Sequence, residues 1–273
     1  MKSFSSGMIF EKSSTRTRVS FETGIYYLGG MGLFLSKNDL QIGRGEPVSD
    51  TARVLSRFVD GIMIRTFSHQ GVEELAHYAS VPVINGLTDL LHPCQVLADL
   101  QTIREHKKGL RGLKLTYVGA GNNMAHSLML GGAKMGMQVT ISCPEDYLPD
   151  EEIYVQARND AKSYGGAIEL ESNPQRAVEG ADVLYTDVWA SMGEEAEQQE
   201  RARILSKYQI NDSLLACAKP DAVVMHCLPA KRGQEISHEV IEGSQSIVFD
   251  QSENRLWAQM SVMALLMADK QRF

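Results

Sequence analysis

The chain has 273 residues, of which 43% are hydrophobic and 22% are charged, a composition typical of one large or two medium globular domains and not of a disordered chain. Its formal net charge of -7 and its lack of a basic run argue against nucleic-acid and membrane partners. We expect a cytoplasmic protein without a disulfide framework, because the sequence shows no signal-peptide core, no bilayer-spanning apolar run and no CxxC pair among its four cysteines.

In the first half of the chain, short β-rich runs alternate with segments of helical period. The predicted strands are Met8–Phe10, Gly32–Leu35, Gly61–Ile64 and Val81–Ile84. The predicted helices are Thr17–Leu28, Asp50–Val59, Val72–Ala79 and Gln95–His106. Alternation of this kind predicts βαβ units and a parallel sheet.

A basic, glycine-containing linker, His106–Lys114, then precedes a second series of alternating elements. Its predicted strands are Leu115–Val118, Gln138–Ser142, Ala167–Leu170, Val183–Thr186, Val223–His226 and Ser246–Phe249. Its predicted helices are Met124–Met135, Glu151–Tyr164, Pro174–Val178, Asp212–Ala218 and Asn254–Ala268. The last helix carries one apolar stripe, formed by Leu256, Met260, Met263, Ala264 and Met267.

The sequence therefore predicts an α/β fold with two doubly wound parallel-sheet domains in tandem. We expect one domain over residues 1–107, joined by the C-terminal helix 256–273, and the other over residues 108–255. Ligands of such sheets bind beyond the carboxyl ends of the strands, so the expected site is the cleft between the two domains.

The segment Ser13–Arg18 combines hydroxyls and two guanidiniums between a predicted strand and a predicted helix. A helix N-terminus has unpaired N–H groups and a partial positive charge, and arginine offers bidentate donors, so this pattern favours a phosphate ligand. A simple N-cap with two solvated arginines is the alternative.

Two further motifs follow predicted strands. In His92–Gln95, an imidazole suited to polarising a carbonyl stands near an amide suited to holding an NH₂ group, although a capping histidine and a surface glutamine would give the same pattern. The loop Gly119–Asn123 lacks the third glycine of a dinucleotide fingerprint. It therefore predicts a tight turn that directs Asn123 toward a ligand, and not a nucleotide site.

Asp187–Gly193 places a carboxylate, a hydroxyl and a glycine-adjacent N–H after a strand, which suits an α-amino acid; an acidic turn before a polar helix is the alternative. Cys227 also follows a strand. At that position it could be a nucleophile, a ligand or a residue that only lines the site. A Cys–His pair with His226 is not expected, because neighbouring strand residues point to opposite faces. Glu253–Arg255 adds one more guanidinium at the last helix.

In this order the motifs STRTR (Ser14–Arg18), HPCQ, DVWASMG, HCLP and ENR resemble the aspartate/ornithine carbamoyltransferase family over nearly the whole chain. The first two are similar to the family's carbamoyl phosphate signature. DxxxSMG with HCLP looks like the version that takes ornithine, and not the version that takes aspartate or putrescine.

This resemblance implies transfer of the carbamoyl group of carbamoyl phosphate to the δ-amino group of L-ornithine, giving L-citrulline and phosphate in arginine metabolism. It implies a homotrimer without metal or organic cofactor, whose first domain binds carbamoyl phosphate and whose second binds ornithine. The implied carbamoyl phosphate ligands are Ser14, Thr15, Arg16, Thr17, Gln41 from a neighbouring subunit, Arg65, His92, Gln95 and Arg255. The implied ornithine ligands are Asn123, Asp187, Ser191, Met192, Cys227 and Leu228. The implied catalytic groups are Arg16, Arg65, His92 and Cys227.

The family normally has a helix ahead of the first strand, whereas almost nothing precedes Met8 here. We therefore expect Leu256 and Met263 to lose cover, at about 1.5–3 kcal/mol for each side chain left exposed. Three alternatives stay open: a carbamoyltransferase for N-acetylornithine or putrescine, a non-catalytic homologue, and a Rossmann oxidoreductase. Asp187 argues against the first, because a free α-ammonium needs such a partner.

Overall fold

The computed structural model describes residues 4–190 and 198–267, and the chain divides into two compact units. Unit 1 comprises Met1–Ala98 with Glu253–Phe273, and unit 2 comprises Asp99–Ser252. Two helices, α4 (Pro93–Lys107) and α11 (Val248–Met267), contribute residues to both units. No described helix is long and apolar enough to cross a membrane.

Unit 1 is built on a parallel sheet in the order β2-β1-β3-β4. The strands are β1 (Ser5–Phe10), β2 (Met31–Ser36), β3 (Gly61–Arg65) and β4 (Val83–Leu87). Its other helices are α1 (Thr15–Tyr27), the 3-10 turn η1 (Gln41–Arg44), α2 (Val48–Phe58) and α3 (His69–Tyr78). All four predicted strands are confirmed, the last displaced by two to three residues.

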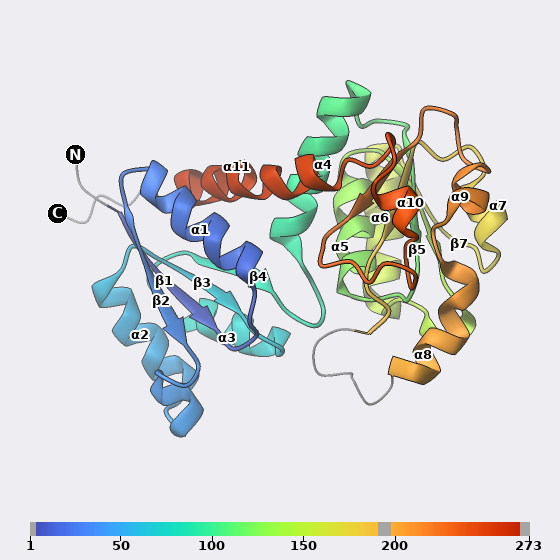
Figure 1. Ribbon diagram of the computed structural model, residues 1–273. Coiled ribbons are helices and arrows are strands. Elements are labelled where there is room, and N and C mark those ends of the chain that lie inside the picture. Colours follow the sequence, from blue (N-terminus) through green and yellow to red (C-terminus); the bar gives the residue numbers. More distant parts are fainter. Residues whose placement is uncertain (1–3, 191–197, 268–273) are drawn as a thin grey trace. The chain divides into compact units, whose positions relative to one another are not determined.

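Strand alternation divides the core of unit 1 into two layers, one on each face of the sheet. Met8 and Phe10 of β1 lie in the layer that includes Phe21 of α1 and Met263 of α11. Ile9 points the other way, into the layer that includes residues of α2 and α3. Figure 1 shows α1 and α11 on one side of this sheet and α2 and α3 on the other.

Unit 2 has a five-stranded parallel sheet in the order β7-β6-β5-β8-β9. The strands are β5 (Lys114–Val118), β6 (Gln138–Ser142), β7 (Ala167–Leu170), β8 (Val183–Thr186) and β9 (Val223–His226). Its helices are α5 (Asn123–Lys134), η2 (Glu145–Tyr147), α6 (Glu151–Tyr164), α7 (Pro174–Val178), α8 (Gln198–Leu205), η4 (Ser206–Tyr208), α9 (Asp212–Leu215) and α10 (His238–Ile241). The prediction of two parallel-sheet α/β domains is thus confirmed.

The strand order reverses once in each sheet, between β1 and β3 in unit 1 and between β5 and β8 in unit 2. At such a switch point the loops after the two strands diverge toward opposite faces and leave a crevice at the carboxyl end of the sheet. The loops after β1, β3, β5 and β8 are therefore the places where each unit is expected to hold a ligand.

The predicted strand Ser246–Phe249 is wrong. Ser246 forms only an isolated bridge with Val224, and α11 begins at Val248, six residues before the predicted start of the last helix. A short apolar run does not distinguish a strand from the buried first turn of a helix. Val248 is apolar because it belongs to the core cluster of unit 2.

The apolar stripe of the last helix is only partly as predicted. Met263 and Met267 are buried, whereas Ala264 is exposed. Met263 therefore does not lose cover as expected. The reason is the close packing of α1 on α11: a Cβ placed at Gly24 would lie 3.0 Å from Met260 Cγ and 3.1 Å from Met263 Cε.

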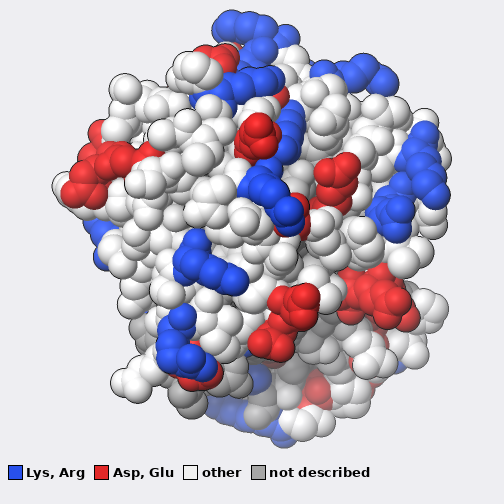
Figure 2. Space-filling model, turned by 90° about the vertical axis from the view of Figure 1, so that its right-hand side faces the viewer, with Lys and Arg blue, Asp and Glu red and all other residues white. Residues whose placement is uncertain are grey.

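Figure 2 shows one face of the molecule, on which lysine and arginine side chains are interspersed with aspartate and glutamate. Among the described residues drawn on that face, no wide basic area is visible. The face therefore offers nothing like the continuous positive surface that a nucleic-acid backbone requires.

Candidate active site

The loop after β1 leads directly into the N-terminus of α1. Ser14 is the N-cap, and its Oγ accepts a hydrogen bond from the Thr17 backbone N at 3.2 Å. The first turn contains no acidic residue to neutralise the positive end of the helix dipole. Thr15 is exposed and Arg16 half-buried on this turn. The arrangement is suited to an anion, as the sequence predicts.

Arg255 of α11 links this turn to α4 within unit 1. Its Nη1 donates to Gln95 Oε1 at 2.6 Å and its Nη2 donates to Thr17 Oγ1 at 3.2 Å. All three side chains are buried, Arg255 being only 3% exposed. A buried guanidinium held in this way has a fixed orientation, which is what recognition of a phosphate or carbonyl oxygen requires.

His92, just before α4, is buried among the positively charged side chains of unit 1. Burial lowers the pKa of His92 well below its ordinary value of 6.5, and the positive charges of Arg255, Arg65, Lys12 and Arg16 lower it further. The imidazole is therefore neutral at neutral pH. Four cations that act on one neutral ring create a strongly positive environment in which that ring can still donate a hydrogen bond.

Arg65 ends β3 and is buried. Its carbonyl oxygen accepts hydrogen bonds from the backbone N of Glu11 at 2.9 Å and of Lys12 at 3.4 Å, which ties the β3 end to the loop after β1. Lys12 was not identified from the sequence, although it directly precedes the serine- and arginine-rich segment. Gln41 lies on η1 with an exposed side chain and is not among the residues that the structure brings together here.

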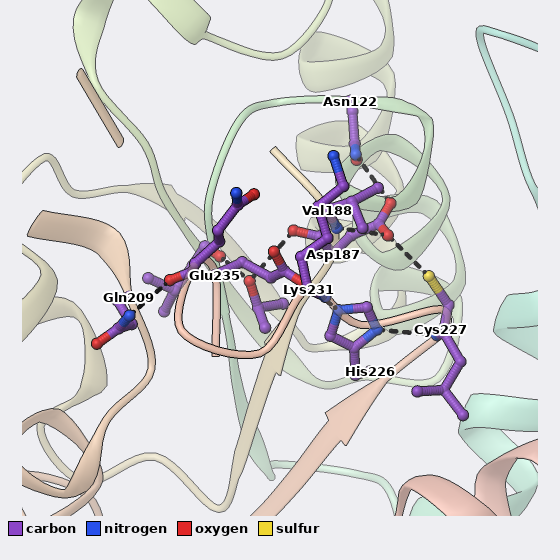
Figure 3. A network of polar contacts seen from close by, with 12 residues as sticks. Asn122, Asp187, Val188, Gln209, His226, Cys227, Lys231 and Glu235 are labelled. Atoms are coloured by element: carbon purple, nitrogen blue, oxygen red, sulfur yellow. Dashed lines mark hydrogen bonds and ion pairs between the residues drawn. The ribbon is translucent and has the colours of Figure 1, made fainter. Parts of the chain in front are cut away.

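In unit 2 the corresponding group centres on Asp187, which follows β8 and is 7% exposed (Figure 3). Asp187 Oδ1 accepts from the Val188 backbone N at 2.8 Å and from the Cys227 thiol at 3.0 Å. Asp187 Oδ2 accepts from Asn122 Nδ2 at 3.0 Å. The carboxylate is thus held by neutral donors. No lysine or arginine is among these partners of Asp187 in the described part of the chain.

Asn122 was missed by the sequence analysis, which favoured Asn123. Asn122 is the N-cap of α5, and its Oδ1 accepts from the backbone N of Met124 at 2.9 Å and of Ala125 at 3.2 Å. Its amide nitrogen is then directed toward Asp187. Asparagine immediately before a helix is a known N-cap signal and could have identified this role. Asn123 is half-buried in the first turn of α5.

Cys227 and Leu228 follow β9, and both are half-buried. The ring nitrogens of the preceding His226 are used elsewhere: Nε2 lies 3.1 Å from Glu235 Oε1, and Nδ1 accepts from the Leu228 backbone N at 2.8 Å. Ser191 and Met192, the two remaining predicted ornithine ligands, lie outside the described residues.

Asp187, His226 and Cys227 also form a possible metal-ligand cluster that the sequence analysis did not identify. One potential ligand atom from each lies within 4.8 Å of the others. Those side chains are already held, Asp187 by Asn122 and Val188, and His226 by Glu235 and Leu228. A cation would have to displace some of these hydrogen bonds to be coordinated there.

Comparison with known proteins gives matches over both units. The family model "Aspartate/ornithine carbamoyltransferase, carbamoyl-P binding domain" matches residues 1–105, and the model for the "Asp/Orn binding domain" of the same family matches residues 111–266. An ornithine carbamoyltransferase of Oceanobacillus iheyensis is 62% identical over 263 residues, which cover 96% of this chain and 82% of that protein.

Solved structures of ornithine carbamoyltransferases are also similar to this chain. The ornithine carbamoyltransferase of Pyrococcus furiosus matches with a TM-score of 0.96 and 54% identity, over 99% of this chain and 86% of that one. The ornithine carbamoyltransferase of Gloeobacter violaceus matches with a TM-score of 0.89 and 50% identity, over 97% and 86% of the two chains. This chain therefore belongs to the aspartate/ornithine carbamoyltransferase family.

Proposed function

We propose that this protein transfers the carbamoyl group of carbamoyl phosphate to the δ-amino group of L-ornithine, giving L-citrulline and phosphate. The observation that carries the choice of amine is Asp187, a largely buried carboxylate whose described partners are all neutral donors. A buried carboxylate without a cationic partner is costly. The α-ammonium of ornithine would supply the missing charge, which N-acetylornithine and putrescine lack at that position.

Unit 1 is proposed to hold carbamoyl phosphate. The hydroxyls, N–H groups and guanidinium at the start of α1 would bind the phosphate, because the helix terminus and Arg16 both favour a dianion. His92 and Gln95 would bind the carbamoyl oxygen and nitrogen. The proposed set is Ser14, Thr15, Arg16, Thr17, Arg65, His92, Gln95 and Arg255, with Gln41 reaching the site of a neighbouring subunit.

Unit 2 is proposed to hold ornithine. Asp187 would pair with the α-ammonium, and Asn123 would donate to the α-carboxylate. Cys227 and the Leu228 carbonyl would lie beside the reacting δ-amine. The proposed set is completed by Ser191 and Met192.

The chemistry that these groups support is attack of a neutral amine on the carbonyl carbon. A C–N bond forms, the C–O bond to phosphate breaks with its electron pair leaving on phosphate, and the proton lost by the amine is taken up by that phosphate. Arg16, Arg65 and Arg255 would stabilise the negative charge that develops on the carbonyl oxygen and on the departing phosphate, and His92 would donate to that oxygen. Holding both substrates adds the advantage of proximity.

The remaining expectations are part of the same proposal. We propose that the protein acts as a cytoplasmic homotrimer and that the transfer needs no metal or organic cofactor. The location of the site in a cleft between the domains stays a prediction. Membership of the carbamoyltransferase family removes the oxidoreductase alternative.

The test is citrulline formation by purified protein from carbamoyl phosphate, with L-ornithine, N-acetyl-L-ornithine, putrescine and L-aspartate assayed in parallel. Turnover confined to L-ornithine is expected. Turnover with a different amine would overturn the assignment of Asp187. Binding of carbamoyl phosphate by a folded protein without turnover of any amine would favour a non-catalytic homologue.

A further inference from the structure

The carboxylate of Glu235 and the imidazole of His226 contact each other beside Cys227 in unit 2 (Figure 3). Both side chains are 0% exposed. His226 ends β9, and Glu235 lies in the loop between β9 and α10. The substrate roles proposed above use neither residue, so their burial and their contacts need a separate explanation.

The hydrogen bonds of His226 fix its tautomer. Nδ1 accepts from the Leu228 backbone N–H at 2.8 Å, so Nδ1 carries no proton. The ring proton therefore sits on Nε2, which donates it to Glu235 Oε1 at 3.1 Å. The same Glu235 oxygen accepts from the Lys231 backbone N at 2.5 Å. One oxygen of Glu235 thus orients the imidazole and also holds the backbone of Lys231, in the loop that follows β9.

The consequence falls on the peptide plane between Cys227 and Leu228. Leu228 has a φ of 56°, a left-handed conformation that is unfavourable for a residue with a side chain and persists only where the surroundings impose it. The acceptor on His226 fixes the N–H of that plane and therefore the direction in which the Cys227 side chain leaves the backbone. That thiol reaches Asp187 Oδ1 at 3.0 Å.

The main chain of His226 is held from a second direction. Its backbone N donates to Gln251 Oε1 at 2.9 Å, and Gln251 Nε2 donates to Asp99 Oδ1 at 2.8 Å and to the Tyr185 hydroxyl at 2.9 Å. By contrast, Glu235 Oε2 has no hydrogen-bond partner among the described residues. A carboxylate buried in this way is a poor contributor to stability, which favours a role in fixing geometry.

We propose that Glu235 and His226 are positioning residues for the amine substrate: the carboxylate sets the imidazole, and the imidazole Nδ1 sets the Cys227–Leu228 backbone that presents the thiol and the Leu228 carbonyl to the δ-amine. This inference rests on the proposed function for its effect on turnover. Its structural part, the control of the Leu228 amide by His226 Nδ1, is independent of which amine reacts.

Two substitutions at His226 separate its two contacts. His226→Asn places an oxygen near the former Nδ1 and keeps an acceptor for Leu228 N, whereas His226→Gln places an amide near the former Nε2 and keeps only the contact with Glu235. Amide hydrogen exchange at Leu228, kcat/KM for L-ornithine and the Kd of carbamoyl phosphate are measured for both. The matched control is Thr116→Val, which removes a buried hydrogen bond of 3.0 Å to the Ala177 carbonyl in the same unit.

We expect His226→Gln to lose the protection of the Leu228 amide against hydrogen exchange. We also expect kcat/KM for L-ornithine to fall about 10²-fold, since moving a catalytic group by about 1 Å can cost that much. His226→Asn keeps the protection and most of that activity, and neither variant changes carbamoyl phosphate binding. Thr116→Val changes neither exchange at Leu228 nor KM for L-ornithine.

Equal loss of protection and activity in the two His226 variants would overturn the proposal. So would a shifted pH profile of kcat in His226→Asn, because it would indicate proton transfer by the ring. If both variants fail to fold, Glu235→Gln, which keeps the accepting oxygen, must preserve Leu228 protection while Glu235→Leu abolishes it. Absence of L-ornithine turnover by the wild-type protein would contradict the proposed function. Hydrogen exchange at the Leu228 amide would still test whether His226 Nδ1 controls that amide.

Discussion

The thiol of Cys227 donates a hydrogen bond to Oδ1 of Asp187 at 3.0 Å, although the two residues are 40 positions apart in the chain. β8 and β9 are adjacent parallel strands, so the residues that follow them emerge at the same edge of the sheet. The contact joins the group proposed to face the reacting amine to the group proposed to bind the α-ammonium. Two of the proposed ornithine contacts, Asp187 and Cys227, are thus positioned by the ends of two neighbouring strands.

Asp187→Asn is expected to raise KM for L-ornithine by roughly 10- to 100-fold, because a hydrogen bond to a charged group contributes about 1.5–3 kcal/mol. Carbamoyl phosphate binding should not change, since Asp187 belongs to unit 2. Steady-state kinetics and calorimetry measure the two quantities. Cys227→Ser, which keeps a donor for Asp187, is the matched variant and should raise KM less. An unchanged KM in Asp187→Asn would remove Asp187 from the ammonium site.

Arg255→Met is expected to weaken carbamoyl phosphate binding by roughly 10- to 100-fold, again on the basis of about 1.5–3 kcal/mol for a charge-assisted contact. Arg255→Lys keeps the charge but loses the planar guanidinium that contacts Gln95 and Thr17. Its affinity for carbamoyl phosphate should therefore lie between those of Arg255→Met and the wild type. Calorimetric titration with carbamoyl phosphate alone is the measurement. Lys134→Met, at a surface ion pair with Asp160 in unit 2, is the control. Wild-type affinity in both Arg255 variants would refute the assignment.

The lowered pKa of His92 has a consequence for stability. Its cause is burial first and neighbouring cations second, so folded His92 resists a proton that the unfolded chain accepts below about pH 6.5. The stability that depends on neutral His92 is therefore complete above that pH and is lost as the pH falls below it. Urea unfolding at pH 7.5, 6.5 and 5.5 should show this loss in wild type and a smaller one in His92→Gln. Parallel curves for the two proteins would contradict the assignment.

Activity should rise with pH. The δ-amine of ornithine resembles that of lysine, whose unperturbed pKa is about 10.4, and only the neutral amine attacks the carbonyl carbon. Far below that pKa, kcat/KM for L-ornithine should increase about tenfold per pH unit. A solvent-viscosity series establishes that chemistry limits the rate. With chemistry limiting, a flat profile from pH 6 to 9 would contradict the neutral-amine mechanism.

Gly121→Ala is expected to destabilise unit 2 by about 1–3 kcal/mol, the typical cost of overpacking. A Cβ at Gly121 would lie 2.3 Å from Pro149 N and 2.6 Å from Leu148 C, and backbone atoms cannot move aside cheaply. Because Asn122 follows directly, KM for L-ornithine should also rise. Thermal unfolding and kinetics measure both effects. Gly109→Ala, with no atom within 4 Å of its Cβ, is the control and should be neutral.

The sequence by itself determined the class of fold and the position of most elements. Nine of the ten predicted strands share residues with an observed strand, β4 by only two residues, because each is a β-rich run bounded by turn residues. It also predicted candidate ligand groups in both units, since Ser14–Arg18, His92 and Asp187 each follow a strand. In a doubly wound sheet that position alone places a side chain at the ligand-binding edge.

Only the tertiary structure decided which side chains hold one another. The contact from Arg255 to Thr17 spans 238 positions, and no local pattern encodes such a partner. Ser246–Phe249 was misread for the same reason: its apolar residues serve a buried helix start, and burial depends on distant neighbours. The roles of Asn122 and of the His226–Glu235 pair likewise arise where separate strand ends converge. Periodicity and capping are properties of neighbouring residues, whereas orientation and electrostatic environment are set by chain segments brought together in folding.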